Sequence, residues 1–162
     1  MNRDEIRELV NKLITNLNLT TPIDFDVFFS NFKDLKIRYG NSNLDVDGRI
    51  TLDNSEGNYI VELRGDGKSN RDRFTIAHEL GHLFLGHVNQ YETLYRRGAN
   101  ELEYAANEFA ADLLMPEADF RRVVNENLDE NSECDIEKVS EIFQVSESAV
   151  LTRGRFLGLF AW

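Results

Sequence analysis

Two histidines and a glutamate at close spacing are the residues of this chain best suited to chemistry. They lie in the segment His78-Glu79-Leu80-Gly81-His82, which has the form H-E-x-x-H. Residues four apart project from one face of an α-helix, about 40° from each other, so His78 and His82 can reach one metal ion. Neutral imidazole is a good Zn²⁺ ligand at about 2.0–2.1 Å. Glu79 lies roughly 100° around the helix, beside the ion, where a general base that activates water belongs.

The surroundings of this motif are typical of a partly buried helix. Residues 74–85 are mainly apolar, and all 3 histidines of the chain fall within residues 78–87. The alternative is an amphipathic core helix with two histidines on its solvent side. Because a motif becomes credible when its helical context is present, the metal site is the favoured interpretation.

The elements that must position the motif follow from hydrophobic periodicity and turn residues. Apolar residues recur three and four apart over residues 6–17 and predict a first helix. Asp24 follows a proline and is suited to cap a short helix that continues to Phe32. Segments typical of strands are Leu35–Tyr39, Arg49–Leu52 and Tyr59–Leu63.

The helix that carries the motif should begin near Ser69 or Asn70. A polar segment, Asn89–Asn100, separates it from an alanine-rich helix over Glu103–Met115, and Pro116 ends that helix or forms a corner. The pattern of the chain after this proline predicts further helices.

The length and composition predict one domain. A chain of 162 residues is long enough to bury a core, and its 41% hydrophobic and 29% charged residues are ordinary for a globular protein. No repeat, low-complexity tract or linker divides it. We therefore expect one domain over residues 1–162, with residues 117–162 as its C-terminal helical part.

The charge balance is strongly acidic, with 18 basic and 29 acidic residues and a net charge of −11. Such a surface repels phosphate and anionic membranes, so direct binding of nucleic acid is disfavoured. It would suit a basic protein partner, although an acidic surface is more often a solubility device.

The sequence favours a cytoplasmic protein. Cys134 is the single cysteine, so no internal disulfide forms, which agrees with a reducing compartment. Its acidic neighbours raise a thiol pKa and disfavour a nucleophile. The chain shows no signal-peptide pattern and no apolar run near 18 residues, so we expect neither secretion nor a membrane span.

A third metal ligand must come from elsewhere, because catalytic zinc usually has three protein ligands. On a continuous helix His87 would lie half a turn from His78, so it is better interpreted as a helix-end histidine near the negative end of the dipole. The carboxylates of the alanine-rich helix are the other candidates, and the alternative for them is a solvated acidic face. Glu103 is favoured because Asn107, four residues later, could orient it. Spacing alone leaves three acidic candidates open: Glu103, Glu108 and Asp112.

Two blocks of the sequence resemble the ImmA/IrrE family of bacterial and phage metallopeptidases. Residues 73–82 end in H-E-L-G-H, and residues 103–116 read E-Y-A-A-N-E-F-A-A-D-L-L-M-P. The family pairs H-E-L-G-H with E-x-x-A-N-x-F-A-A-x-L-L-M-P. A further block, from Val145 to Leu159, looks like the C-terminal block of the family, so the resemblance extends over most of the chain.

The resemblance implies an α+β fold: a zincin-like core with a small β-sheet, an active-site helix and additional C-terminal helices. It implies Zn²⁺ held by His78, His82 and Glu103, as in gluzincin-type proteases, with Glu79 as the catalytic residue. Mn²⁺ or Fe²⁺ suits similar ligands. Asp112 stands where the family often has Glu, at a position that the pattern suggests tolerates solvent.

By resemblance the chain is a zinc endopeptidase that cleaves a helix-turn-helix repressor of a mobile element, prophage or stress response. The basic face of a repressor would suit the acidic chain. The alternative is an anti-repressor on a zincin fold that binds with weak or no cleavage, against which the intact motif argues.

Substrate binding is less determined by the sequence. The strands could offer an edge to an extended substrate. Donors to the oxyanion of the reaction could be Tyr91, Tyr95, Arg96, Arg97 or Arg153, and the sequence does not choose among them. Residues 139–156 have a helix-turn-helix-like pattern, but packing on the core is favoured over DNA binding given the acidic balance. The sequence does not fix the oligomeric state.

Overall fold

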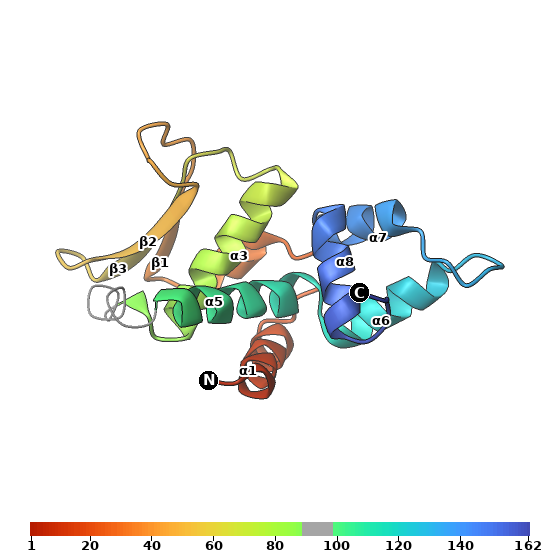
Figure 1. Ribbon diagram of the computed structural model, residues 1–162. Helices are drawn as coiled ribbons and strands as arrows, with labels where there is room; N and C mark the ends of the chain where they lie inside the picture. The colour runs from red at the N-terminus through yellow and green to blue at the C-terminus, as the bar shows by residue number, and fades with distance from the viewer. Residues whose placement is uncertain (89–98) are drawn as a thin grey trace.

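The helix that carries the histidine motif lies between a small sheet and a second long helix (Figure 1). The computed structural model describes residues 1–88 and 99–162. Helix α3 spans Asn70–Phe84 and contacts strands β2 and β3 as well as helix α5, Ala99–Leu114. Helix α1, Arg3–Asn16, packs on α5. The motif is thus held from the sheet side and by α5.

The described sheet has three strands in the order β1-β3-β2. Strand β1 runs parallel to β3, and β2 runs antiparallel to it. The three strands predicted from the sequence are confirmed, each within one residue of its predicted ends. Their bounds are β1 Leu35–Arg38, β2 Gly48–Asp53 and β3 Asn58–Leu63.

Side-chain caps set where the first helices begin. Asn2 and Glu5 form a reciprocal capping box at α1. Asp24 accepts hydrogen bonds from two backbone amides at the start of α2, Phe25–Ser30, so the predicted cap is confirmed. The Ser69 hydroxyl accepts from the Asp72 amide at 3.0 Å, which fixes the start of the motif helix at the predicted place.

The C-terminal part consists of three helices gathered on the side away from the sheet (Figure 1). Pro116 separates α5 from α6 and ends the long helix, as predicted. The further helices expected after it are confirmed, with bounds α6 Glu117–Glu126, α7 Ile136–Phe143 and α8 Glu147–Phe156.

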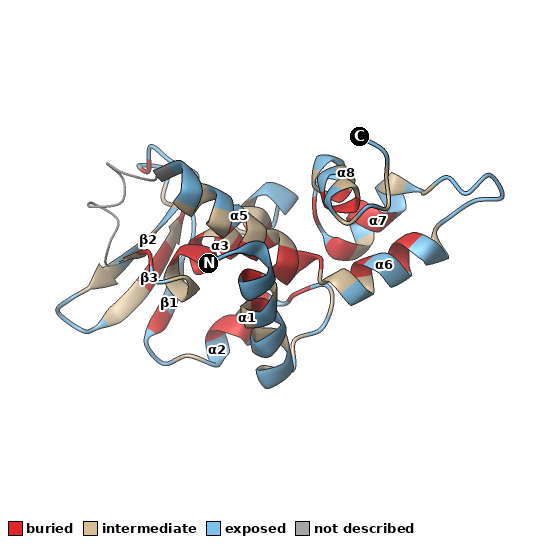
Figure 2. Cartoon of the chain, turned by 60° about the horizontal axis from the view of Figure 1, so that its bottom comes forward, coloured by how far each residue is buried: buried red, intermediate tan, exposed pale blue. Residues whose placement is uncertain are grey.

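One apolar cluster runs from the sheet through α3 and α5 to the C-terminal helices (Figure 2). Leu63, Leu80, Phe109 and Phe143 have no exposed surface. Burying a side chain of this size contributes about 1.5–3 kcal/mol, so the cluster fixes α3 against α5 firmly. Among the described residues, none of the helices has the length and apolarity needed to span a bilayer.

Candidate metal centre

Three side chains from two helices converge at the contact between α3 and α5. The Nε2 atoms of His78 and His82 lie 3.1 Å apart. The Glu103 carboxylate reaches both, with Oε2 2.9 Å from His78 Nε2 and Oε1 3.0 Å from His82 Nε2. The structure therefore brings together the three residues that the resemblance singled out as ligands.

The donor set fits a divalent cation of the zinc class. Ligand atoms at 2.0–2.1 Å from a tetrahedral ion lie about 3.3 Å from one another. The three measured distances, between the two Nε2 atoms and from each Nε2 to a Glu103 oxygen, are within a few tenths of an ångström of that separation. One ligand atom from each residue can be chosen so that all three lie within 4.8 Å of one another. Two imidazoles and one carboxylate leave one open position, as in catalytic sites. The His82 side chain is 2% exposed and that of Glu103 is 44% exposed, so the site is open on the Glu103 side.

Asn107 orients His78. The Oδ1 atom of Asn107 lies 2.7 Å from His78 Nδ1. Because an amide oxygen only accepts, Nδ1 carries the hydrogen and Nε2 keeps its lone pair for the ion. Asn107 was expected to orient Glu103, four residues earlier on the same helix. In the structure it contacts His78 of the opposite helix instead, because both side chains face the same contact between α3 and α5.

His87 lies behind His82, just past the end of the motif helix, where its backbone N–H donates to the His82 carbonyl oxygen at 2.8 Å. The helix ends at Phe84, and Gly86 has a φ of 78°, so the chain turns back. His87 is 7% exposed, with its Nδ1 3.0 Å from His82 Nδ1. In the tautomer that leaves His82 Nε2 for a metal, His82 donates to His87 through Nδ1. The sequence signal for this turn was Gly86.

Gly81, inside the motif, lets α5 approach α3. A Cβ atom there would lie 3.1 Å from the Cα and O atoms of Ala106 and from Cβ of Phe109. Only a residue without a side chain fits at this distance unless the helices shift. Gly81 on α3 and Ala106 on α5 therefore allow a close helix contact, and the contact places Glu103 within reach of both histidines.

Glu79 is buried beside the cluster and is 9% exposed. Burial, and then the negative charge of Glu103, raise the pKa of Glu79 to about 7. Burial, and then the neighbouring His78, lower the pKa of His82 to about 4, so this imidazole is neutral. A neutral ring is the form that binds a metal, and a carboxyl with a pKa near neutrality can accept and return a proton.

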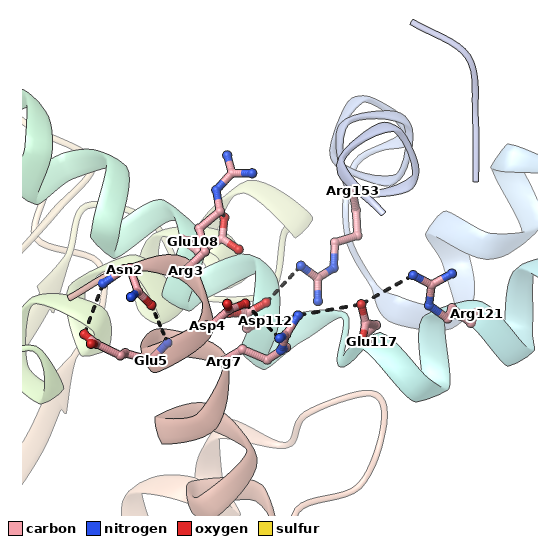
Figure 3. A network of polar contacts seen from close by, with 10 residues as sticks. All are labelled: Asn2, Arg3, Asp4, Glu5, Arg7, Glu108, Asp112, Glu117, Arg121 and Arg153. Carbon is pink, nitrogen blue, oxygen red and sulfur yellow. Dashed lines mark hydrogen bonds and ion pairs between the residues drawn. The ribbon is translucent and has the colours of Figure 1, made fainter. Parts of the chain in front are cut away.

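The other acidic candidates on α5 face elsewhere. Glu108 lies 3.8 Å from Arg3 of α1. Asp112 is 3% exposed and pairs with Arg153 of α8 at 2.9 Å (Figure 3). The expectation that Asp112 tolerates solvent was therefore wrong: it belongs to a buried ion pair that ties α5 to the C-terminal helices.

The oxyanion donor stays undetermined. Arg153 Nε donates to the Met115 carbonyl oxygen, and Nη1 meets Asp112, so this guanidinium faces the ion pair. The other four candidates, Tyr91, Tyr95, Arg96 and Arg97, lie outside the described residues. Cys134 is not a metal-cluster member, and burial and Asp135 raise its thiol pKa, against a nucleophile.

Comparison with known proteins agrees with this geometry. Residues 32–154 match a peptidase family described as the IrrE N-terminal-like domain. The fold is also similar to that of a Mycobacterium tuberculosis transcriptional regulator, with a TM-score of 0.59 and 16% sequence identity over 93% of this chain. The chain spans 46% of that larger protein. No curated protein matches the sequence.

The matched residues cover most of the chain, including α3, α5, α6, α7 and most of α8. The mixed architecture, with a small sheet and an active-site helix, agrees with the zincin-like fold that the resemblance implied. The chain therefore belongs to the IrrE N-terminal-like family of peptidases.

Proposed function

We propose that the chain is a zinc-dependent endopeptidase that cleaves a helix-turn-helix transcriptional repressor in the cytoplasm. The observation that carries the proposal is the convergence of His78, His82 and Glu103 on one point, with buried Glu79 beside them. A bound zinc ion would polarise the peptide carbonyl. It would also lower the pKa of a water molecule bound to it to about 7.

The chain supplies the proton transfers through Glu79. Its carboxylate accepts a proton from water, and the resulting hydroxide attacks the peptide carbonyl carbon. Glu79 then gives the proton to the amide nitrogen as the C–N bond breaks, leaving a carboxylic acid and an amine. Because the side chain is nearly buried, few waters compete for its oxygen atoms.

Strand β2 lies near the metal centre and could pair with an extended substrate. Strand β2 forms one edge of the described sheet and contacts α3. The free backbone groups of an edge strand can bind a peptide by strand addition. This would hold the chain of the substrate beside the motif helix.

The choice of a repressor is supported by the resemblance and by charge. Members of the ImmA/IrrE family typically cleave such proteins. A repressor has a basic face for DNA, which the net charge of −11 attracts. Direct DNA binding by the chain itself is not part of the proposal, since Arg153, within the helix-turn-helix-like segment, is buried against Asp112.

The test is incubation of the zinc-loaded chain with the helix-turn-helix repressor encoded beside its gene, followed by mass spectrometry of the products. We expect one discrete cleavage. Glu79→Gln should retain zinc and lower the cleavage rate about 10²–10⁴-fold, the usual contribution of acid–base catalysis. Glu126→Gln, the same change on an exposed position of α6, should cleave like the wild type.

Wild-type cleavage by Glu79→Gln would refute the role of this carboxylate. A stable complex with the repressor and no fragment from the wild-type chain would support the anti-repressor alternative instead.

A further inference from the structure

A groove of about 1000 Å³ lies among α1, α5 and α8. Its walls are mostly apolar. Phe74 of α3 and Ala149 of α8 line it from two sides, and the N-terminal turn of α1 forms a third. Its volume is at the upper end of the range of about 300–1,000 Å³ for ligand pockets, enough to hold several side chains.

The groove and the metal centre share one neighbour, Asn107. Asn107, which orients His78 from 2.7 Å, is part of the groove lining. Phe74 lies one helical turn before His78, and Tyr104 follows Glu103 directly. Any polypeptide placed for hydrolysis at the centre must leave it in some direction, and the groove lies on the Asn107 side of the centre.

The rim of the groove is rich in exposed apolar surface. Tyr104 is 72% exposed and Phe156 is 49% exposed, although both are large hydrophobic side chains. Trp162, 81% exposed, packs edge-on against Phe156 with ring centroids 5.2 Å apart. Aromatic residues grouped in this way are enriched in interfaces where binding energy is concentrated.

The charged side chains that line the groove balance one another, although the chain as a whole is strongly acidic. Its charged lining residues are two arginines and two glutamates: Arg3, Glu101, Glu108 and Arg153. Arg3 lies near Glu108 at 3.8 Å (Figure 3). Its guanidinium also stacks over the Phe156 ring, 4.2 Å from the ring centroid. Such a surface matches an uncharged apolar segment better than the basic face that suits the rest of the chain.

We propose that this groove binds an apolar segment of the substrate polypeptide on one side of the scissile bond and so sets specificity. The inference rests on the proposed peptidase function. Two surfaces of the chain would then bind one substrate. The acidic surface would bind its basic face, and the groove would bind bulky apolar side chains near the cleaved bond.

The probe is a library of random peptides displayed on phage and selected against zinc-loaded Glu79→Gln. Enriched peptides are synthesised with a fluorophore, and their binding is measured by anisotropy. We expect them to carry aromatic or branched apolar residues. In the same background, Ala149→Trp fills the groove and should weaken binding by about tenfold or more, and Tyr104→Ala should weaken it by about fivefold.

Each variant has a matched control outside the groove lining. Ala118→Trp makes the same change on an exposed position of α6, and Tyr39→Ala removes a tyrosine that is 44% exposed. Both should bind the peptides within about twofold of the parent. Zinc content measured by mass spectrometry should be equal in all of them, which separates loss of the groove from loss of the fold.

Binding tests the groove, and hydrolysis of the same peptides by the wild-type chain tests the proposed function. Peptides that bind as expected but stay intact would refute the function alone. The groove proposal would be overturned if Ala149→Trp and Tyr104→Ala bound every enriched peptide as tightly as the parent. It would also be overturned if the selection enriched no peptide. A dimer in light scattering that Ala149→Trp dissociates would overturn it too, because a second copy would then be the occupant.

Discussion

Two groups of polar side chains on helix α5 differ in what they face. Near its start, the carboxylate oxygens of Glu103 lie close to the Nε2 atoms of His78 and His82. Each of these atoms can accept a hydrogen bond or bind a cation. Near its end, Asp112 meets the guanidinium of Arg153. The first group is open to solvent through Glu103, whereas both residues of the second are buried.

The difference indicates which group needs a ligand. Two imidazole nitrogens and a carboxylate about 3 Å from one another form a donor set that one divalent cation can bind. Burial raises the pKa of Asp112 to about 6 against the opposing effect of Arg153, so at neutral pH this carboxylate is ionised and the pair neutralises itself. The first arrangement is built for a metal, and the second holds the C-terminal helices to α5.

The largest expected effect on folding is from the ion pair. Asp112→Ala leaves the Arg153 charge buried without its partner and should lower the free energy of unfolding by about 3–5 kcal/mol. Urea denaturation measures this. Asp112→Leu combined with Arg153→Met should recover most of the loss, since both buried charges are then gone. A double variant as unstable as the single one would show that the pair is not the cause.

The largest expected effect on metal binding is from the other end of α5. Glu103→Ala should weaken zinc binding by more than about 100-fold, because even residues outside the ligand set cost about 10–100-fold. Competition with a chelating dye measures this. The metal-free variant should be about as stable as the metal-free wild type, because the Glu103 side chain is 44% exposed and solvent screens its contacts. Glu108→Ala, on the same helix but facing Arg3, should bind zinc normally; the reverse order would move the ligand to Glu108.

The residues that orient the histidines should have smaller effects. Asn107→Ala and His87→Ala each remove the partner of a ring Nδ1 and should weaken zinc binding by about 10–100-fold. Both should therefore rank below Glu103→Ala in the same dye competition. If His87→Ala weakened zinc binding more than Glu103→Ala did, His87 would be the third ligand.

The smallest effect expected is from the helix contact. Gly81→Ala adds a methyl group where Ala106 and Phe109 are already 3.1 Å away. The cost of overpacking, about 1–3 kcal/mol, is partly offset by the better helix propensity of alanine, about 1 kcal/mol. We expect a small loss in thermal stability. We also expect a loss of zinc affinity that is smaller than the loss in Asn107→Ala, because Glu103 moves with α5. Unchanged values for both would show that the helices have room to spare.

What the sequence predicts well is local. His78 and His82 lie within one helix, so their spacing alone places them on one face. Ser69 and Asp24 are each adjacent to the helix that they cap. The strands follow from alternation over a few residues, and the structure confirms them.

What it predicts poorly depends on packing between distant elements. Spacing could not separate Glu103 from Glu108 and Asp112, because only the packing of α5 on α3 decides which carboxylate faces the histidines. Asp112 was misjudged because its partner, Arg153, comes from α8. The contact of the His87 ring with His82 could not be predicted, because a continuous helix places that ring half a turn away, whereas the chain turns back at Gly86.

The most direct test of the metal centre is X-ray absorption at the zinc edge on the zinc-loaded chain. We predict a shell of two imidazole nitrogens and carboxylate oxygen at about 2.0–2.2 Å, with one imidazole lost in His82→Ala and the carboxylate lost in Glu103→Ala. A shell with three imidazoles, or one that neither substitution changes, would contradict the assignment of His78, His82 and Glu103.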